Sequence, residues 1–172
     1  STIWLDFFEY ISKYFKILNN QVETFSTLYD DMEQSPYIWT LLAIAIVGPI
    51  VEELMFRGLI YRSLEKAIEI PWIPIIVSGV MFGAWHGSFI QGVYTAILGI
   101  ILAYYYKKTR SLFLVITVHI INNFLSTLPP AWDTDFSYSL ILVISYLCIA
   151  PMIAIMVYLH RKSKIQVENT AI

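Results

Sequence analysis

Apolar residues occur in long runs along this chain, and short polar segments separate the runs. The segment 37–51 (YIWTLLAIAIVGPIV) carries no charge, and a helical pattern continues from it to about residue 68. At a rise of about 1.5 Å per residue, this helix would reach about 45 Å, which exceeds the bilayer core of about 30 Å. The pattern therefore predicts a first helix that can cross a membrane.

Four further apolar segments follow the first helix, and we interpret each of them as a span. Their ranges are 72–90, 91–106, 111–128 and 138–159. With strict alternation, the clusters of Lys and Arg after the first, third and fifth spans fall on one side, and the acidic stretches fall on the other. The positive-inside rule then places the C-terminus in the cytoplasm, with the protein in the plasma membrane if the source is a prokaryote.

The N-terminal segment has a different pattern. Residues 3–18 place their charges every three or four positions on an otherwise apolar helix, which favours a position in the headgroup plane. We therefore predict an interfacial amphipathic helix with an acidic linker over 1–35, a helical membrane domain over 36–160, and a basic cytoplasmic tail over 161–172.

Composition agrees with an integral membrane protein. The 172 residues are 58% hydrophobic and only 14% charged, whereas an average soluble domain is about 25% charged. This excludes an ordinary soluble enzyme, and the net charge of −2 disfavours nucleic-acid binding, which needs a basic face. The predicted fold class is all-α, a polytopic helical membrane protein with about five spans.

Charged side chains within a span are costly and indicate function by default. The first span contains Glu52, Glu53 and Arg57. Glu53 and Arg57 are four residues apart, share a helix face and can pair, while Glu52 lies about 100° away around the helix. The spacing suggests one structural carboxylate held by arginine and one working carboxylate, Glu52, although Glu53 and Arg57 could also be only a buried ion pair.

Two further spans each carry a polar residue with a companion at the same four-residue spacing. Phe82 and His86 lie in the second, and His119 and Asn123 lie in the fourth. With each helix centred on the bilayer, Glu52 and His119 fall near the midplane and His86 about 8 Å from it, a gap that ordinary tilts can close. Three helices can thus bring coordinating groups together.

This set of groups allows two kinds of hydrolytic site. A carboxylate beside a histidine can position and deprotonate a water, and a second histidine with an asparagine can stabilise the oxyanion. Alternatively, Glu52, His86, His119 and Asn123 could be ligands of one divalent metal, zinc being the first choice. No Ser or Cys nucleophile has an evident base, so hydrolysis by activated water is the simplest interpretation.

The three motifs, Glu52-Glu53-x-x-x-Arg57, Phe82-x-x-x-His86 and His119-x-x-x-Asn123, resemble in order and placement those of the CPBP family, the CAAX proteases and bacteriocin-processing enzymes, also called the Abi family. The resemblance covers about residues 40–127. It implies an intramembrane endopeptidase whose members are commonly labelled metalloproteases, although a metal-free glutamate mechanism is also argued for them.

The resemblance also implies roles for individual residues. Glu52 would be the general base, His86 would help to hold the water, and His119 and Asn123 would serve the oxyanion or a metal. Supporting roles would fall to Glu53, Arg57 and Phe82. The expected partners are membrane lipids and a peptide or lipidated-protein substrate, with no nucleic acid. The alternative is a non-catalytic membrane immunity or scaffold protein, since some relatives are associated with bacteriocin self-immunity.

Overall fold

The computed structural model describes residues 35–129 without a gap and shorter pieces on both sides. These pieces are 10–13, 20–23, 26–27, 131–132, 134–137, 139–141, 143–144, 147, 154–155 and 157–158. Regular secondary structure in the described residues is helical, with no strand among them, which confirms the all-α prediction. The predicted N-terminal helix, fifth span and basic tail lie wholly or largely outside the described residues.

The first predicted helix forms as one continuous rod from Tyr37 to Ala67. It is built from five successive segments, two of which have wider, π-helical turns. The segments are α3 (Tyr37–Thr40), π-helical η1 (Leu41–Val47), α4 (Gly48–Glu53), π-helical η2 (Leu54–Tyr61) and α5 (Arg62–Ala67). Glu52 and Glu53 thus lie at the end of the α-helical turns between the two wide segments.

A proline explains the wide turns of η1. Pro49 has no backbone N–H, and its ring would clash with the carbonyl of the residue four positions before it in an α-helix. The helix instead shifts its register, so that the Gly48 amide donates to the carbonyl of Ala43, five residues back. Such widened turns are frequent at functional sites.

Three more helices complete the described bundle: α6 (Ile73–Trp85), α7 (Phe89–Thr109) and α8 (Leu112–Ser126). The predicted division between the apolar segments 72–90 and 91–106 is present, but it lies a few residues earlier, since α6 ends at Trp85 and α7 already begins at Phe89. The chain turns after Trp85, where Gly87 has a φ of +68°, and the Ser88 side chain then caps α7 by accepting from the Gln91 amide. A positive φ is open to glycine without steric cost.

Helices α6 and α7 pack unusually closely, because glycines line their contact. A Cβ added to Gly79 would meet the backbone of Ile100, and one added to Gly83 would meet the carbonyl oxygen of Gly92. Small residues allow such close approach between membrane helices. The pair therefore forms a tight hairpin that can hold Phe82 and His86 in a fixed position.

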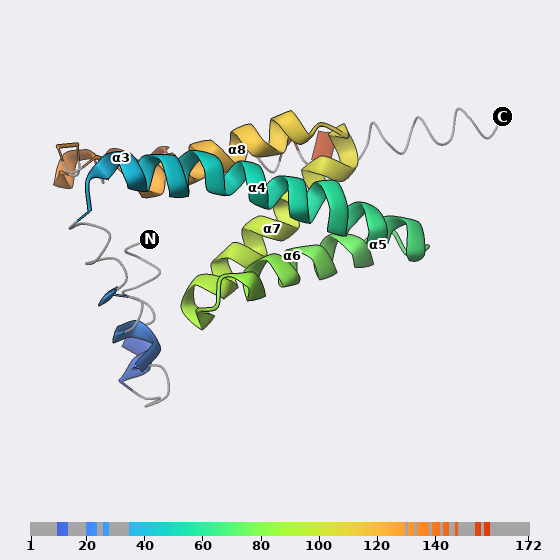
Figure 1. Cartoon of the computed structure of the whole chain (residues 1–172), viewed down its shortest axis with the longest axis horizontal. Helices are drawn as coiled ribbons and strands as arrows, with labels where there is room; N and C mark the ends of the chain where they lie inside the picture. Colours follow the sequence, from blue (N-terminus) through green and yellow to red (C-terminus); the bar gives the residue numbers. More distant parts are fainter. Residues whose placement is uncertain are drawn as a thin grey trace.

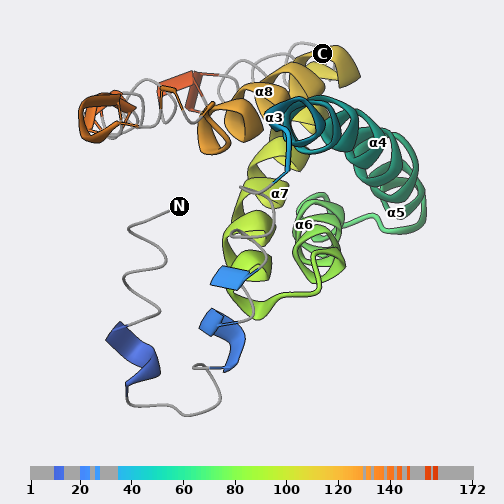
Figure 2. The same ribbon diagram turned by 60° about the vertical axis from the view of Figure 1, so that its left-hand side comes forward.

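Two of the described helices, Tyr37–Ala67 and Phe89–Thr109, are long and apolar enough to cross a membrane, while α6 and α8 are shorter apolar helices. Figure 1 shows the long helix running beside α8, with α6 below them and α7 rising from below to the start of α8, and Figure 2 shows the same arrangement from another side. The predicted number of about five spans stays a prediction.

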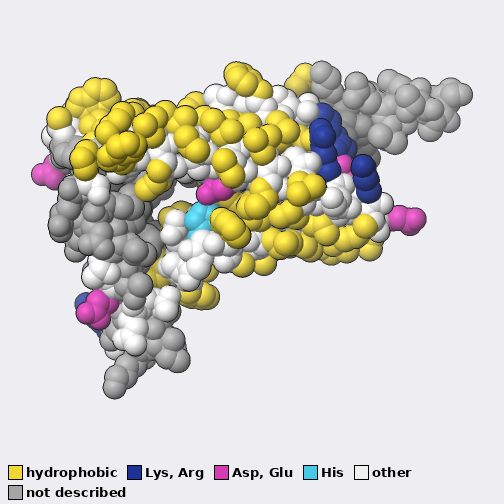
Figure 3. Space-filling view, viewed as in Figure 1, with side chains coloured by type: hydrophobic (Ala, Val, Ile, Leu, Met, Phe, Trp, Pro, Cys, Tyr) yellow, Lys and Arg dark blue, Asp and Glu magenta, His cyan; other side chains and the backbone are white. Residues whose placement is uncertain are grey.

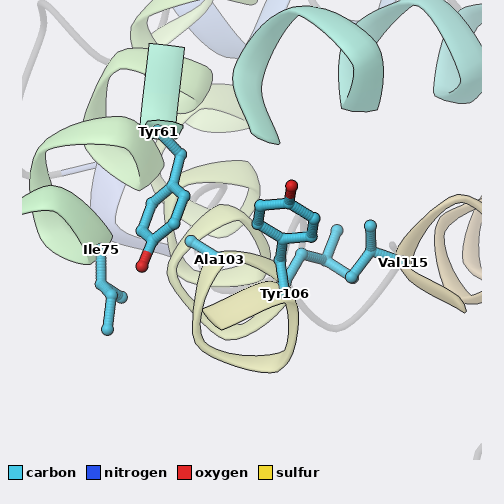
Figure 4. Packing of buried hydrophobic residues seen from close by; sticks show 6 residues of the cluster. Tyr61, Ile75, Ala103, Tyr106 and Val115 are labelled. Atoms are coloured by element: carbon cyan, nitrogen blue, oxygen red, sulfur yellow. The ribbon is translucent and has the colours of Figure 1, made fainter. Parts of the chain in front are cut away.

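The buried apolar cluster lies where the long helix, α6, α7 and α8 meet. In Figure 4 the rings of Tyr61 and Tyr106 lie between Ile75 on one side and Val115 on the other. The two rings meet edge to face at 5.7 Å between centroids, a favourable geometry for aromatic pairs. This cluster joins the long helix to α6, α7 and α8, and so fixes the frame in which the polar residues meet.

Candidate active site

The centre of the polar cluster is the predicted pair of Glu53 and Arg57. Arg57 Nη1 donates to Glu53 Oε1 at 2.6 Å, and both side chains are completely buried. The second Nη of Arg57 donates to the carbonyl oxygen of Gly99 on α7 at 2.8 Å. The ion pair therefore does more than connect two turns of one helix, because it also ties the long helix to α7.

The same carboxylate oxygen also binds a histidine. His119 Nδ1, on α8, lies 2.8 Å from Glu53 Oε1, and His119 is 2% exposed. An ionised carboxylate can only accept, so Nδ1 carries the proton of this bond. In a neutral imidazole, Nε2 is then the unprotonated nitrogen, with a lone pair available to a second partner.

Glu52 lies on the side of this histidine that remains available. Its Oε2 is 3.7 Å from His119 Nε2, and its side chain is 22% exposed. Among the described residues, Glu52 Oε2 has no hydrogen-bond partner, although the atom itself is buried. Figure 3 shows an acidic side chain beside a histidine at the edge of a hollow, with hydrophobic side chains above and below.

Phe82 separates the two predicted histidines. Its buried ring meets His86 edge to face at 4.9 Å and His119 at 5.6 Å, and the Arg57 guanidinium lies 4.8 Å from the ring centroid. The half-buried His86 uses Nδ1 to bind the carbonyl oxygen of Phe82 at 2.9 Å. Since a carbonyl accepts, Nδ1 carries a proton here also, and Nε2 is left for another partner.

Asn123 makes no hydrogen bond to Glu52 or Glu53. Its Nδ2 donates to the carbonyl oxygen of Ile44 in η1 at 2.9 Å, and its Oδ1 accepts from the exposed Asn122 at 3.2 Å. The structure thus brings together Glu52, Glu53 and His119, with Phe82 linking them to His86, whereas Asn123 binds the backbone of the long helix.

The predicted metal site is only partly assembled. Within the described part of the chain, no three His, Cys, Asp or Glu side chains form a group that could hold a metal ion. Of the four predicted ligands, Glu52 and His119 are adjacent, and the amide of Asn123 is engaged elsewhere. A complete ligand set is therefore absent from this arrangement, and zinc binding stays a prediction.

Sequence reasoning missed two connections of the site. It assigned Glu53 to Arg57 alone, although Glu53 also binds His119, and it gave no partner to Gly99, whose carbonyl accepts from Arg57. The first could have been anticipated, because a histidine that uses one nitrogen functionally commonly donates the other to a carboxylate. The second is a contact of the main chain and leaves no signal in the residue types.

Fold and site together define a helical membrane protein with a carboxylate–histidine centre inside an apolar bundle, and the comparisons with known proteins agree. Residues 34–125, more than half of the chain, match the family model for Rce1-like type II CAAX prenyl endopeptidases. The chain belongs to this Rce1-like family, which confirms the resemblance found in the three motifs.

A curated relative adds a second comparison. The chain is 25% identical over 106 residues to a Bacillus subtilis (strain 168) protein described as "Putative membrane peptidase YdiL". This match covers 62% of the chain and 42% of that protein, so the chain spans less than half the length of the curated relative it matches. No solved structure matches. Family and relative both support a membrane-embedded peptidase.

Proposed function

We propose that the protein is an intramembrane endopeptidase that hydrolyses a peptide bond with a water activated by Glu52 and His119. The observation that carries the proposal is the separation of 3.7 Å between Glu52 Oε2 and His119 Nε2. Both atoms are hydrogen-bond acceptors when the carboxylate is ionised and the imidazole is neutral. They lie too far apart to bind each other directly and close enough to share one water.

A water held in this way is already oriented for attack. Its two O–H groups donate to Glu52 and His119, so its lone pairs face away from both, toward a substrate carbonyl. As the oxygen attacks the carbonyl carbon, Glu52 accepts the proton of the water. When the C–N bond then breaks, Glu52 returns this proton to the leaving amine, so that water has been added across the amide.

Three neighbours support this chemistry without receiving the proton. Glu53 fixes the tautomer and direction of His119, and Arg57 compensates the charge of Glu53. His86 lies on the other side of Phe82, and when protonated it keeps an Nε2–H that can donate to the oxyanion. Asn123 has no part in the proposed steps, since its amide is bound to the helix backbone.

The substrate class follows from the family and from the surroundings. We infer that the substrate is a peptide or a prenylated protein tail of the CAAX type, since the family is described by that activity. A prenyl chain would remain among lipid tails beside the apolar bundle while the peptide reaches Glu52. The scaffold alternative is less well supported, because it gives no reason for a carboxylate oxygen left without a partner beside a histidine.

The test is cleavage of prenylated CAAX peptides and of a quenched peptide library by the protein in proteoliposomes. Glu52→Gln is expected to reduce cleavage by about 10³-fold or more with little change in thermal stability, because the amide cannot accept the proton. Glu69→Gln, at an exposed position between α5 and α6, is the matched control. Normal turnover by Glu52→Gln would contradict the mechanism, and cleavage abolished by a chelator would favour the metal site.

A further inference from the structure

The side-chain amide of Asn123, a predicted catalytic residue, donates to a backbone carbonyl in the middle of another helix, which is an unusual acceptor. The carbonyl of Ile44 belongs to the wide turns of η1, about two turns before Glu52. In a regular helix each such carbonyl accepts from an amide further along the same helix, and a side chain from another helix is not needed. The reason for this contact lies in the proline that follows.

The register of η1 leaves the Ile44 carbonyl without an intrahelical donor. The Gly48 amide donates to Ala43, five residues back. The next bond in that register would run from residue 49 to the carbonyl of Ile44, but Pro49 has no N–H to donate. A backbone carbonyl without a partner in an apolar environment costs several kcal/mol, so a substitute donor is strongly favoured.

We propose that Asn123 is a positioning residue that replaces the missing amide of Pro49 and thereby holds the register that points Glu52 and Glu53 toward His119. The donor stands 2.9 Å from the Ile44 oxygen, an ordinary length for this bond. The catalytic meaning of this role rests on the function proposed above, whereas the bond and its effect on stability do not.

The geometry of α8 strengthens this inference. His119 and Asn123 are one helical turn apart on α8, and they contact Glu53 and Ile44 respectively. The later residue of α8 thus meets the earlier residue of the long helix, so the two helices run antiparallel and are fastened at two points. The bond to Glu53 orients His119, and the bond to Ile44 holds the turns of the long helix that precede Glu52 and Glu53.

A double-mutant cycle between Pro49→Ala and Asn123→Ala tests the inference. Alanine at position 49 supplies the missing N–H, so the Ile44 carbonyl gains an intrahelical donor in either register, and Asn123 becomes dispensable. In the otherwise unchanged protein, Asn123→Ala is expected to lower the apparent Tm in detergent by about 2–8 °C and cleavage by about 10–100-fold. In the Pro49→Ala background, both losses should shrink to less than half.

A neighbouring asparagine provides the control for this cycle. Asn122→Ala, at the exposed neighbour, should leave Tm near that of the unchanged protein. If Asn123→Ala leaves Tm unchanged and reduces cleavage equally in both backgrounds, Asn123 acts on the substrate and the inference is overturned. If the unchanged protein cleaves no peptide, the proposed function fails, while the cycle in Tm still decides the role of Asn123.

A second variant covers the case in which Pro49→Ala does not fold. Asn123→Asp keeps the shape of the side chain but offers only acceptors when ionised, so it cannot cap a carbonyl. We expect it to lower Tm at least as much as Asn123→Ala, because a carboxylate then faces a carbonyl oxygen. An Asn123→Asp protein with unchanged Tm would overturn the inference without any measurement on Pro49.

Discussion

In the part of the chain that the structure describes, the bundle has two ion-paired clusters, which differ mainly in how exposed their side chains are. In the interior cluster, the side chains of Glu53 and Arg57 are both fully buried. In the cluster at the end of the bundle, Arg110 pairs with Glu65 while their side chains are 56% and 25% exposed. Each cluster joins the long helix to another part of the fold. A glutamate and an arginine thus make the connection in both places, once in the buried interior and once in contact with solvent.

The difference shows what burial adds to an ion pair. At the exposed end, water and salt screen the charges, and the hydrogen bonds of Glu65 raise the pKa of Arg110 above its usual range. In the interior, Arg57 and Glu53 depend on each other, because neither can recover solvation if its partner is lost. The interior cluster should therefore be sensitive to every change, and the end cluster tolerant.

The largest effect is expected for Arg57→Met. This change leaves Glu53 buried with a histidine as its remaining partner, and removal of one member of a buried pair costs about 3–5 kcal/mol. Thermal unfolding in detergent should show a large loss, with poor recovery of folded protein. Arg62→Met, which removes the exposed arginine bound to Tyr106 at the end of the bundle, is the matched control and should change stability far less. Equal losses in the two variants would refute the contrast.

An intermediate effect is expected for Glu53→Gln. Glutamine can still accept from His119 but no longer stabilises the charge of Arg57 or favours one tautomer of the imidazole. We expect cleavage to fall about 10–100-fold, as when a group that orients a functional histidine is removed. The loss should appear in kcat more than in KM, because Glu53 orients His119 and does not touch the substrate. An unaltered kcat would show that Glu53 supports the fold alone.

The smallest effect is expected for Arg110→Gln. An exposed pair contributes about 0–1 kcal/mol, and less at high salt. The change in Tm should therefore be small at low ionic strength and vanish in concentrated salt. A loss as large as that of Arg57→Met would mean that this end of the bundle is closed to water in the membrane.

The sequence predicted the helices and the ion pair well because both follow from local spacing. The uncharged run before Glu52 indicates the long helix, and the four-residue spacing of Glu53 and Arg57 brings them onto one face. The polar residues 87–92 also indicate the break between the second and third apolar segments, which falls at Gly87 and the capping Ser88, a few residues before the predicted boundary at 90.

The partners across helices were harder to predict. Spacing cannot tell which carboxylate a distant histidine will bind, so no partner was predicted for His119, whose hydrogen bond goes to Glu53. Asn123 was assigned to the oxyanion or a metal from its place in the third motif. Its amide instead donates to the carbonyl of Ile44 in the π-helical turns of η1, and the spacing of residues in the sequence does not reveal such turns. Registers of this kind arise from packing as well as from local propensity.

The double attachment of α8 bears on how a substrate reaches the glutamates. A lateral gate between α8 and the long helix would have to break the bonds of His119 and Asn123 together before any peptide could enter. The α6–α7 hairpin is closed in another way, by glycine contacts that leave no room for a side chain. On the remaining side, Phe56 of the long helix packs edge to face against Phe82 and Trp85 of α6, so a peptide entering there would have to displace aromatic rings but neither bond of α8.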